Sequence, residues 1–460
     1  MITLKEILAI KETQFKIANL NENSVFSSVV IDSRKVTPGA LFVAIKGERF
    51  DGHDFVEDVL KAGAAAVVVK SRKFAHFAGA GAPVVGAPDT VGAFGSIAGA
   101  WRRSKNAPVI GITGSNGKTT TKDILATLLG LKYRVVATSA NNNNHIGVPL
   151  TLLEAGNDTE FVVCEIGTNH FGEIAYSAGI AAPDHAVITN IGDSHLEFLI
   201  NRTGVKKEKQ ALLEVTHNRG GKVYLNIDHP FLKRMVKLFP DAITLSMNGN
   251  AMINGQLLHY TETGLPVMKI EKGNKSVRFE LGLYGRKNCD NALVAAAIAH
   301  ECGMSFEEIG EAFANVKPPK GRMNRLHLNG FSLIDDTYNA NPESMMGAFY
   351  AMSKDLIHTR RYAVLGDMFE LGEDAPAMHA GLAEHIKRAK INRVFLTGKN
   401  MKQLHKALKS MGISSFHYKT KEDIIDTLSN TDLMDALILV KGSRGMRMET
   451  IVEFLKENGK

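Results

Sequence analysis

The sequence predicts an α/β protein of three domains, and three observations support this prediction. Short apolar runs typical of β-strands alternate with segments of helical periodicity along most of the chain. A Gly/Ala/Pro-rich stretch, residues 78–88, and a Lys/Pro-rich stretch, residues 317–321, interrupt this alternation. A chain of 460 residues is also too long for one hydrophobic core. We expect domains at residues 1–88, 89–316 and 317–460.

The first domain is expected to be a small mixed α/β unit. Residues 41–45 (Leu-Phe-Val-Ala-Ile) and 65–69 (Ala-Ala-Val-Val-Val) are short apolar runs typical of buried strands. Residues 78–88 follow them, and we expect the domain to end there.

The second domain is expected to hold a parallel sheet covered by helices. Helical periodicity at residues 121–129 and 205–213 separates strand-like runs, and the alanine-rich residues 291–300 predict a buried helix. Shorter alternating runs around Asn254-Gly255 and Gly273 predict an inserted antiparallel meander within residues 251–284. The strand-like runs are residues 108–113, 134–138, 161–166, 186–191 and 222–227.

The third domain repeats the alternation and predicts a Rossmann-like α/β unit. Its strand-like runs are residues 331–335, 362–365, 393–396 and 436–440.

Composition narrows the function classes. The formal net charge of +7 is mild for this length, and no Lys/Arg block with interleaved aromatic residues predicts nucleic-acid binding. Lys5 and Glu6 interrupt the N-terminus, so no signal peptide is expected, and no apolar run is long enough to span a membrane. Cys164, Cys289 and Cys302 form no C-x-x-C pair. We expect a cytoplasmic protein.

The strongest motif is a glycine loop between a predicted strand and a predicted helix. The segment Gly-Ser-Asn-Gly-Lys-Thr-Thr follows the strand at residues 108–113. Glycines let backbone N–H groups converge on a polyphosphate, Lys118 supplies a cation, and the Thr119 hydroxyl can ligate Mg²⁺. The loop predicts ATP binding and makes the second domain P-loop-ATPase-like. Its expected nucleotide-binding residues are Gly114, Ser115, Asn116, Gly117, Lys118, Thr119 and Thr120.

With this loop, the sequence resembles the Mur ligase family over nearly its whole length. Residues 142–153 (Asn-Asn-Asn-His-Ile-Gly-Val-Pro-Leu-Thr-Leu-Leu) are similar to the family's asparagine-rich substrate loop. Residues 165–170 (Glu-Ile-Gly-Thr-Asn-His) follow a buried strand, as the family's metal-binding Glu does. Residues 285–292 resemble its adenine-contacting segment, although Lys287 stands where the family usually has His.

The resemblance assigns roles to several of these positions. It implies that Glu165, His195 and an N-carboxylated Lys209 hold a second Mg²⁺ beside the one at Thr119. It also implies that Asn288 and Asn291 contact adenine, and that Arg322 and Asp336 reach the nucleotide from the third domain. The catalytic set it implies is Lys118, Glu165, His195, Lys209 and Arg322.

Two segments indicate which reaction of the family to expect. Residues 335–342 (Asp-Asp-Thr-Tyr-Asn-Ala-Asn-Pro) and 364–372 resemble those of the members that add D-alanyl-D-alanine. Residues 32–34 (Asp-Ser-Arg) and 51–53 (Asp-Gly-His) resemble the UDP-sugar-binding module shared with the diamino-acid-adding members. The substrate-binding residues implied are Ser33, Arg34, Phe42, Gly47, Asp51, His53, Asn143, Asn144, Asn169, His170, Tyr338, Asn339 and Asn341.

The expected reaction is therefore ATP-dependent ligation in peptidoglycan synthesis. The resemblance implies that ATP phosphorylates the terminal carboxylate of a UDP-MurNAc-tripeptide, that the amine of D-Ala-D-Ala attacks the acyl phosphate, and that the enzyme acts as a monomer. The alternative acceptor is UDP-MurNAc-L-Ala-D-Glu, for a diamino-acid-adding ligase. A P-loop kinase or ATPase is the alternative from another class, but it leaves the first and third domains without a role.

Several candidate residues also have a structural interpretation. Glu165 can be an ordinary carboxylate at a strand end, and His195 can cap a turn. Lys209 lies in a run of charged residues, 206–209, which is typical of a solvated helix face. Asn341 before Pro342 can be a helix N-cap.

Overall fold

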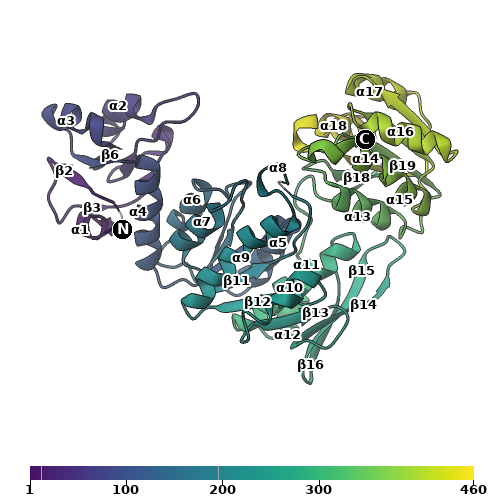
Figure 1. Cartoon of the computed structure of the whole chain (residues 1–460), viewed down its shortest axis with the longest axis horizontal. Helices are drawn as coiled ribbons and strands as arrows, with labels where there is room; N and C mark the ends of the chain where they lie inside the picture. The colour runs from purple at the N-terminus through teal and green to yellow at the C-terminus, as the bar shows by residue number, and fades with distance from the viewer. Residues whose placement is uncertain (12, 195, 460) are drawn as a thin grey trace.

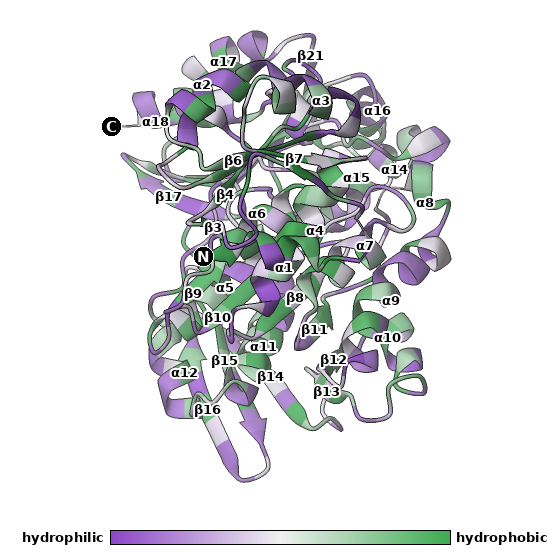
Figure 2. Ribbon diagram, turned by 90° about the vertical axis from the view of Figure 1, so that its left-hand side faces the viewer, coloured by the Kyte–Doolittle hydropathy of each residue, from purple (hydrophilic) through white to green (hydrophobic). Residues whose placement is uncertain are grey.

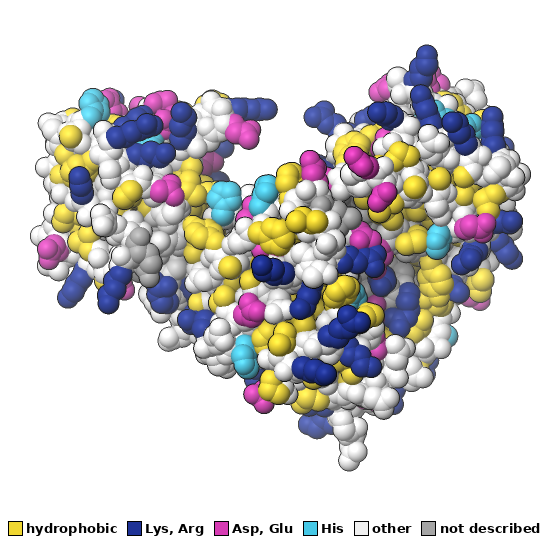
Figure 3. Space-filling model, viewed as in Figure 1, with side chains coloured by type: hydrophobic (Ala, Val, Ile, Leu, Met, Phe, Trp, Pro, Cys, Tyr) yellow, Lys and Arg dark blue, Asp and Glu magenta, His cyan; other side chains and the backbone are white. Residues whose placement is uncertain are grey.

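In the computed structural model, which describes residues 1–11, 13–194 and 196–459, the chain forms three α/β units. Figure 1 shows them as an open V, with the N-terminal unit on one arm, the central unit at the base and the C-terminal unit on the other arm. Figure 3 shows the molecule hollowed between the two arms, above the central unit. Each unit is built around its own sheet, which confirms the predicted three-domain α/β class.

The first unit holds a sheet of strand order β2-β7-β6-β5-β4. Strands β4 to β7 are parallel and β2 is antiparallel to β7, while β1 and β3 form a separate pair. Both predicted strand runs are confirmed, and residues 78–88 supply β7. Its elements are β1 (Ile2–Thr3), α1 (Leu4–Leu8), β2 (Lys16–Ala18), β3 (Val25–Phe26), β4 (Val29–Val30), η1 (Ser33–Lys35), β5 (Leu41–Val43), η2 (Gly52–Phe55), α2 (Val56–Lys61), β6 (Ala66–Lys70), α3 (Ser71–Gly79) and β7 (Val84–Ala87).

Helix α4 (Thr90–Arg103) connects the first unit to the second. Asp89 caps it by accepting hydrogen bonds from the N–H groups of Val91 and Gly92. Its apolar face, including Phe94 and Ile97, packs in the core of the first sheet, and the helix also contacts α6 and α7 of the second unit. The boundary at residue 88 stays a prediction.

The second unit holds a sheet of order β16-β15-β14-β13-β12-β11-β8-β10-β9. The strands from β9 across to β14 are parallel, whereas β15 and β16 are antiparallel. Helices α5, α11 and α12 cover one face, and α7, α9 and α10 the other. Its elements are β8 (Val109–Thr113), α5 (Lys118–Gly130), β9 (Val135–Ala137), α6 (Gly147–Leu153), β10 (Phe161–Glu165), α7 (Glu173–Ala181), β11 (His185–Ile188), α8 (Leu196–Leu199), α9 (Arg202–Asn218), β12 (Lys222–Asn226), α10 (Pro230–Met235), β13 (Ile243–Ser246), β14 (Ile253–Tyr260), β15 (Pro266–Lys272), β16 (Lys275–Glu280), α11 (Arg286–Glu301) and α12 (Phe306–Phe313).

The antiparallel insertion is present, but its first turn lies elsewhere than predicted. Asn254 and Gly255 lie inside β14, and the chain reverses at residues 261–265 instead. Because β14 pairs in parallel with β13, the meander extends the central sheet rather than standing apart from it. Figure 2 shows hydrophobic residues concentrated on the inner strands, whereas the β14–β16 extension is mixed.

The third unit holds a sheet of order β17-β18-β22-β19-β20-β21, with β17 antiparallel and the remaining strands parallel. All four predicted strand runs are confirmed. Its elements are β17 (Asn324–Leu328), β18 (Phe331–Asp336), α13 (Pro342–Met352), β19 (Arg360–Gly366), η3 (Gly372–Asp374), α14 (Ala375–Ala380), α15 (Leu382–Arg388), β20 (Arg393–Thr397), α16 (Met401–Ser410), β21 (Ser414–Tyr418), α17 (Lys421–Ser429), β22 (Ala436–Lys441), η4 (Arg444–Met446) and α18 (Glu449–Asn458). None of the helices in the described part of the chain is both long and apolar enough to cross a bilayer.

Candidate active site

The phosphate loop has the predicted position between β8 and α5. Gly117 begins α5 with a φ of 82°, and a Cβ there would lie 2.5 Å from Oδ1 of Asn291, so the position requires glycine. As the N-cap residue, Gly117 has no side chain with which to cap this helix. Its first N–H groups are therefore left for an anionic ligand such as a phosphate.

Lys118 is folded back onto the loop. Its Nζ donates a 2.8 Å hydrogen bond to the carbonyl oxygen of Gly114. Burial lowers the pKa of Lys118, with the charge of Glu165 opposing and that of Arg322 adding to the shift. A phosphate in the loop would place a further anion beside this partly buried ammonium group.

Residues that follow β11 form hydrogen bonds to the phosphate loop, which follows the neighbouring strand β8. The Asn116 N–H donates to Oδ1 of Asn190 at 2.9 Å, and the Thr189 hydroxyl donates to the Asn116 carbonyl at 2.5 Å. Ser115 and Ser194 share a hydroxyl–hydroxyl contact of 2.9 Å. These bonds fix the loop conformation before any nucleotide binds.

Glu165 stands at the end of β10, beside the phosphate loop. Its side chain accepts a 2.9 Å hydrogen bond at Oε1 from Nδ2 of Asn143. The residue is 2% exposed, and Oε2 is buried without a hydrogen-bond partner among the described residues. A buried carboxylate oxygen without a donor is costly unless a cation or ligand completes it.

Lys209 is buried on α9 rather than on a solvated helix face. It is 1% exposed, and no hydrogen bond or ion pair joins it to another described residue. Burial, reinforced by the charge of Lys118, lowers the pKa of Lys209 well below its ordinary value, while Glu208 and Glu165 oppose the shift.

The predicted role of His195 cannot be placed, because this residue lies outside the described residues. Among the residues that are described, no three His, Cys, Asp or Glu side chains form a group able to hold a metal ion.

The third unit supplies the opposite wall of the site. The Arg322 guanidinium donates from Nη2 to the Thr119 hydroxyl at 3.2 Å and lies 4.0 Å from the centre of the Tyr338 ring. Asp336 accepts from the Met323 N–H at 3.1 Å and pairs with Nζ of Lys441 at 2.6 Å. The linker and the ends of β18 and β22 thus place these groups beside the phosphate loop.

Helix α13 contacts the phosphate loop through its first turn. Nδ2 of Asn341 donates to Oδ1 of Asn116 at 2.7 Å, and Nδ2 of Asn116 donates to Oε2 of Glu343 at 3.0 Å. Lys287, the residue that departs from the family pattern, pairs with Oε1 of Glu343 at 3.1 Å while its side chain stays 63% exposed.

A single cavity of about 720 Å³ joins these walls. The adenine candidates lie on its rim, where Asn288 donates to the Tyr284 carbonyl and accepts from Nδ2 of Asn291. Gly114 and Lys209 are not part of the lining. The predicted residues that line it are Ser115, Asn116, Gly117, Lys118, Thr119, Thr120, Asn143, Glu165, Asn288, Asn291, Arg322, Asp336, Tyr338, Asn339 and Asn341.

Other predicted substrate residues surround the site or serve local structure. Asn144 caps α6 by accepting from the N–H groups of Ile146 and Gly147. Asn169 and His170 are exposed before α7, where both contact the Glu173 carboxylate.

The first unit gathers its predicted residues at the carboxyl ends of its parallel strands. Arg34 forms hydrogen bonds that lower the pKa of Asp32 to about 2, and Ser33 and Gly47 lie on the neighbouring loops. His53 is buried, and both of its ring nitrogens have partners. Its Nδ1 contacts Asp51, and its Nε2 accepts a hydrogen bond from the Lys70 N–H. Phe42 is buried in the core of the unit.

Sequence reasoning missed Asn190, Glu343 and Lys441, which line the cavity, and Glu208, which lies behind it. A polar segment directly after β11 could have indicated Asn190, because β11 and β8 are adjacent parallel strands. Lys441 ends β22 in the same way.

Comparison with known proteins gives matches along the whole chain. Family models match as the Mur ligase family catalytic domain at residues 25–102, the Mur ligase middle domain at residues 112–299 and the Mur ligase glutamate ligase domain at residues 321–444. The UDP-N-acetylmuramoyl-tripeptide–D-alanyl-D-alanine ligase of Bacillus subtilis is 34% identical over 448 residues, covering 95% of this chain and 94% of that protein.

Solved structures agree. A crystal structure of MurF from Acinetobacter baumannii has a TM-score of 0.86 at 26% identity and covers 99% of this chain and 98% of that chain. MurF of Thermotoga maritima in complex with ADP has a TM-score of 0.81 at 27% identity and covers 94% of this chain and 97% of that chain. With three matching family models and a full-length relative, the chain belongs to the Mur ligase family.

Proposed function

We propose that this protein is the ATP-dependent ligase that adds D-Ala-D-Ala to UDP-MurNAc-tripeptide and so completes the pentapeptide precursor of peptidoglycan. The full-length similarity to ligases of that name supports the substrates. One observation carries the reaction type, namely that the phosphate loop and residues 338–341 of the third unit face each other across one cavity. A phosphorylated carboxylate held by the loop would thus meet an amine held by the third unit.

The chain's own residues fit the two steps of this reaction. A carboxylate must first be activated as an acyl phosphate, because oxide is too poor a leaving group for direct attack by an amine. Lys118 and the N-terminus of α5 would hold the β- and γ-phosphates of ATP, and Arg322 would neutralise charge from the other side. Attack by the amine then expels phosphate, so both steps depend on positioning and charge.

The site also fits the predicted Mg²⁺ ions. Thr119, Glu165 and a carboxylated Lys209 would provide oxygen ligands, with His195 as the remaining candidate. Such an ion would bind Oε2 of Glu165, which has no hydrogen-bond partner among the described residues. When bound, Mg²⁺ neutralises phosphate charge and brings the γ-phosphate and the acceptor carboxylate together.

The surroundings of Lys209 support its carboxylation. The lowered pKa raises the share of neutral amine, whose nitrogen lone pair can attack the carbon of CO₂, form an N–C bond and release one proton. The product is an anionic oxygen ligand where a cationic lysine would repel a metal ion.

We assign substrates to domains with the proposed boundaries 1–88, 89–316 and 317–460. The first domain would bind the UDP-sugar at Ser33, Arg34 and the loop from Gly47 to His53. The tripeptide would extend past Asn143 and His170 toward the phosphate loop. Tyr338, Asn339 and Asn341 would receive the dipeptide. ADP bound to the relative from Thermotoga maritima supports the nucleotide assignment. We also propose a cytoplasmic monomer.

The decisive experiment is ligation with purified protein, ATP and Mg²⁺. We expect UDP-MurNAc-tripeptide and D-Ala-D-Ala to give stoichiometric phosphate, ADP and pentapeptide by mass spectrometry. Incorporation of a diamino acid into UDP-MurNAc-L-Ala-D-Glu instead would identify the other ligase type. ATP hydrolysis without any amide product would exclude a ligase.

A further inference from the structure

The third unit contacts the central unit at a second place, away from the phosphate loop. This contact joins the turn at residues 261–264, between β14 and β15, to the loop that follows α13, residues 353–359. The Leu356 N–H donates to the Glu262 carbonyl oxygen at 3.0 Å. Tyr260 and Tyr350 meet edge to face beside it, and the Lys354 ammonium lies over both rings.

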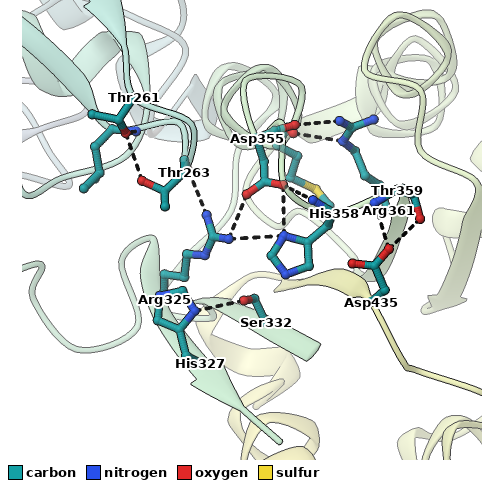
Figure 4. A network of polar contacts seen from close by, with 12 residues as sticks. Thr261, Thr263, Arg325, His327, Ser332, Asp355, His358, Thr359, Arg361 and Asp435 are labelled. Atoms are coloured by element: carbon teal, nitrogen blue, oxygen red, sulfur yellow. Dashed lines mark hydrogen bonds and ion pairs between the residues drawn. The ribbon is translucent and has the colours of Figure 1, made fainter. Parts of the chain in front are cut away.

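Arg325 is at the centre of this contact. Figure 4 shows its side chain extended between Thr263 of the turn and Asp355 of the third unit. Its Nη1 donates to the Thr263 carbonyl oxygen at 2.7 Å, and its Nη2 lies 2.7 Å from Oδ2 of Asp355. The side chains of Arg325 and Asp355 are 3% and 2% exposed. His358 completes the cluster, with Nδ1 2.9 Å from Oδ1 of Asp355.

The turn also approaches the third unit closely through its backbone. Gly264 has a φ of 86°, and a Cβ there would lie 3.2 Å from the Lys354 carbonyl carbon and 3.3 Å from the Asp355 nitrogen. A side chain at this position would be strained by the positive φ and would force the turn and residues 354–355 to shift relative to each other.

Helix α11 also packs against α13 between these two places, and the contacts at the phosphate loop and at the turn differ in what opening them would cost. At the phosphate loop, Asn116, Glu343 and Lys287 are at least partly exposed, so water can replace their bonds cheaply. At the turn, separation would break the backbone bond from Leu356 to Glu262 and the bond from Arg325 to the Thr263 carbonyl oxygen, and it would also separate the rings of Tyr260 and Tyr350. The turn contact is therefore the more costly of the two to open.

Arg325 also lies close in sequence to a residue of the site. It is three residues after Arg322, at the start of the β17–β18 pair, where it stands opposite Ile334. The Asp336 carboxylate, at the end of β18, accepts a hydrogen bond from the Met323 N–H. Fixing Arg325 to the turn therefore fixes the segment that carries Arg322 relative to the central sheet.

We propose that the contact between residues 261–264 and 353–359 is a permanent pivot for the third unit, and that Arg325 is a positioning residue that sets the reach of Arg322 to the phosphate loop. This inference rests on the proposed ligase function for its kinetic test. Its structural test, exchange of the Leu356 amide hydrogen, requires only nucleotide binding.

Two pairs of variants test the pivot in the full-length chain. Gly264→Ala alters the contact, and Gly273→Ala is its control, because Gly273 also has positive φ in the next hairpin turn but its Cβ would meet nothing within 4 Å. Arg325→Lys keeps the charge but cannot reach both partners. Arg102→Lys is its control, because Arg102 also joins a carbonyl oxygen, of Ala181, and a carboxylate, of Asp184, but lies on α4, away from the third unit.

We expect kcat to fall at least tenfold in Gly264→Ala and Arg325→Lys, with the KM for UDP-MurNAc-tripeptide within twofold of wild type. Both controls should stay within twofold in kcat. Exchange of the Leu356 amide should be equally slow in wild type with and without ATP, and at least tenfold faster in the two pivot variants. Wild-type kinetics in both pivot variants, or wild-type exchange that changes with ATP, would overturn the pivot. A wild-type protein that makes no pentapeptide would overturn the proposed function alone.

Discussion

Asn341 donates a 2.7 Å hydrogen bond to Asn116 of the phosphate loop while its other amide atom caps α13. Its Nδ2 reaches across to Asn116, and its Oδ1 accepts from the Ser344 N–H at 2.8 Å. One side chain thus starts a helix in the third unit and joins that unit to the second. The structural interpretation of Asn341 as an N-cap is correct, and the residue also reaches the site.

The two roles of Asn341 can be separated by substitution. Serine also caps helices but is too short to reach Asn116, so Asn341→Ser should raise the KM for ATP several-fold with little loss of stability. Asn341→Ala should show the same kinetic defect and lose in addition about 0.5–2 kcal/mol in free energy of unfolding. Initial rates against ATP concentration and urea unfolding measure the two effects. An Asn341→Ser variant with wild-type kinetics would show that the contact with Asn116 is incidental.

Lys118 should be indispensable for ligation. Its ammonium group donates a hydrogen bond to the Gly114 carbonyl oxygen within the loop, and it would donate to a phosphate bound there instead. Lys118→Ala should lose about 2.7–4 kcal/mol of transition-state stabilisation, the range measured when one donor to a developing anion is removed. We expect kcat to fall by about 10²–10³ with the circular dichroism spectrum unchanged. Lys132→Ala, at an exposed position just after α5, serves as control. Activity within tenfold of wild type in Lys118→Ala would refute the assignment.

Lys209 should make ligation depend on bicarbonate and on pH. Because its folded pKa is below the unfolded value of 10.5, the unfolded state binds more protons between the two values. Its contribution to stability is therefore fully present above pH 10.5 and is lost as pH falls through the folded pKa. Carboxylation requires the neutral amine, so activity should also fall as the pH falls.

Stripping bicarbonate should reduce the activity of wild type, and adding it back should restore the rate. Lys209→Ala should be inactive and insensitive to bicarbonate. Lys207→Ala, an exposed position on the same helix, should behave as wild type. A wild-type rate that does not respond to bicarbonate would argue against the carbamate.

The strands were predictable because buried parallel strands must be apolar on both faces, which leaves a continuous run such as residues 108–113 or 436–440. The phosphate loop was predictable because it lies within one strand–loop–helix segment. The turn predicted at Asn254-Gly255 was wrong, because that dipeptide is typical of hairpin turns but here continues β14 along the parallel edge of β13.

Contacts between units could not be read from local patterns. Glu343 and Lys441 enter the cavity only because α13 and β22 pack where they do. The charged run at residues 206–209 is typical of a solvated face, yet Glu208 and Lys209 are buried because α9 packs against α7 and the sheet.

Glu208 provides the last prediction, since it shapes the site without lining it. Helix α7 starts at Gly172, which has no side chain to cap it. The Glu208 carboxylate, from α9, takes this role by accepting from the N–H groups of Gly172 at 2.7 Å and Ile174 at 2.8 Å. It thereby holds the loop that carries the substrate candidates Asn169 and His170.

In Glu208→Gln, the new amide NH₂ would face a backbone donor, so one buried N–H would lose its acceptor. We expect a loss of about 1–3 kcal/mol in free energy of unfolding, seen as a lower urea midpoint with an unchanged m-value. We also expect a higher KM for UDP-MurNAc-tripeptide, because the loop before α7 would no longer be held in place, while the KM for ATP should be unaffected. Glu214→Gln, an exposed position on the same helix, should change neither the midpoint nor the KM. If Glu208→Gln lowered stability but left the KM for the tripeptide unchanged, the loop before α7 would not take part in binding it.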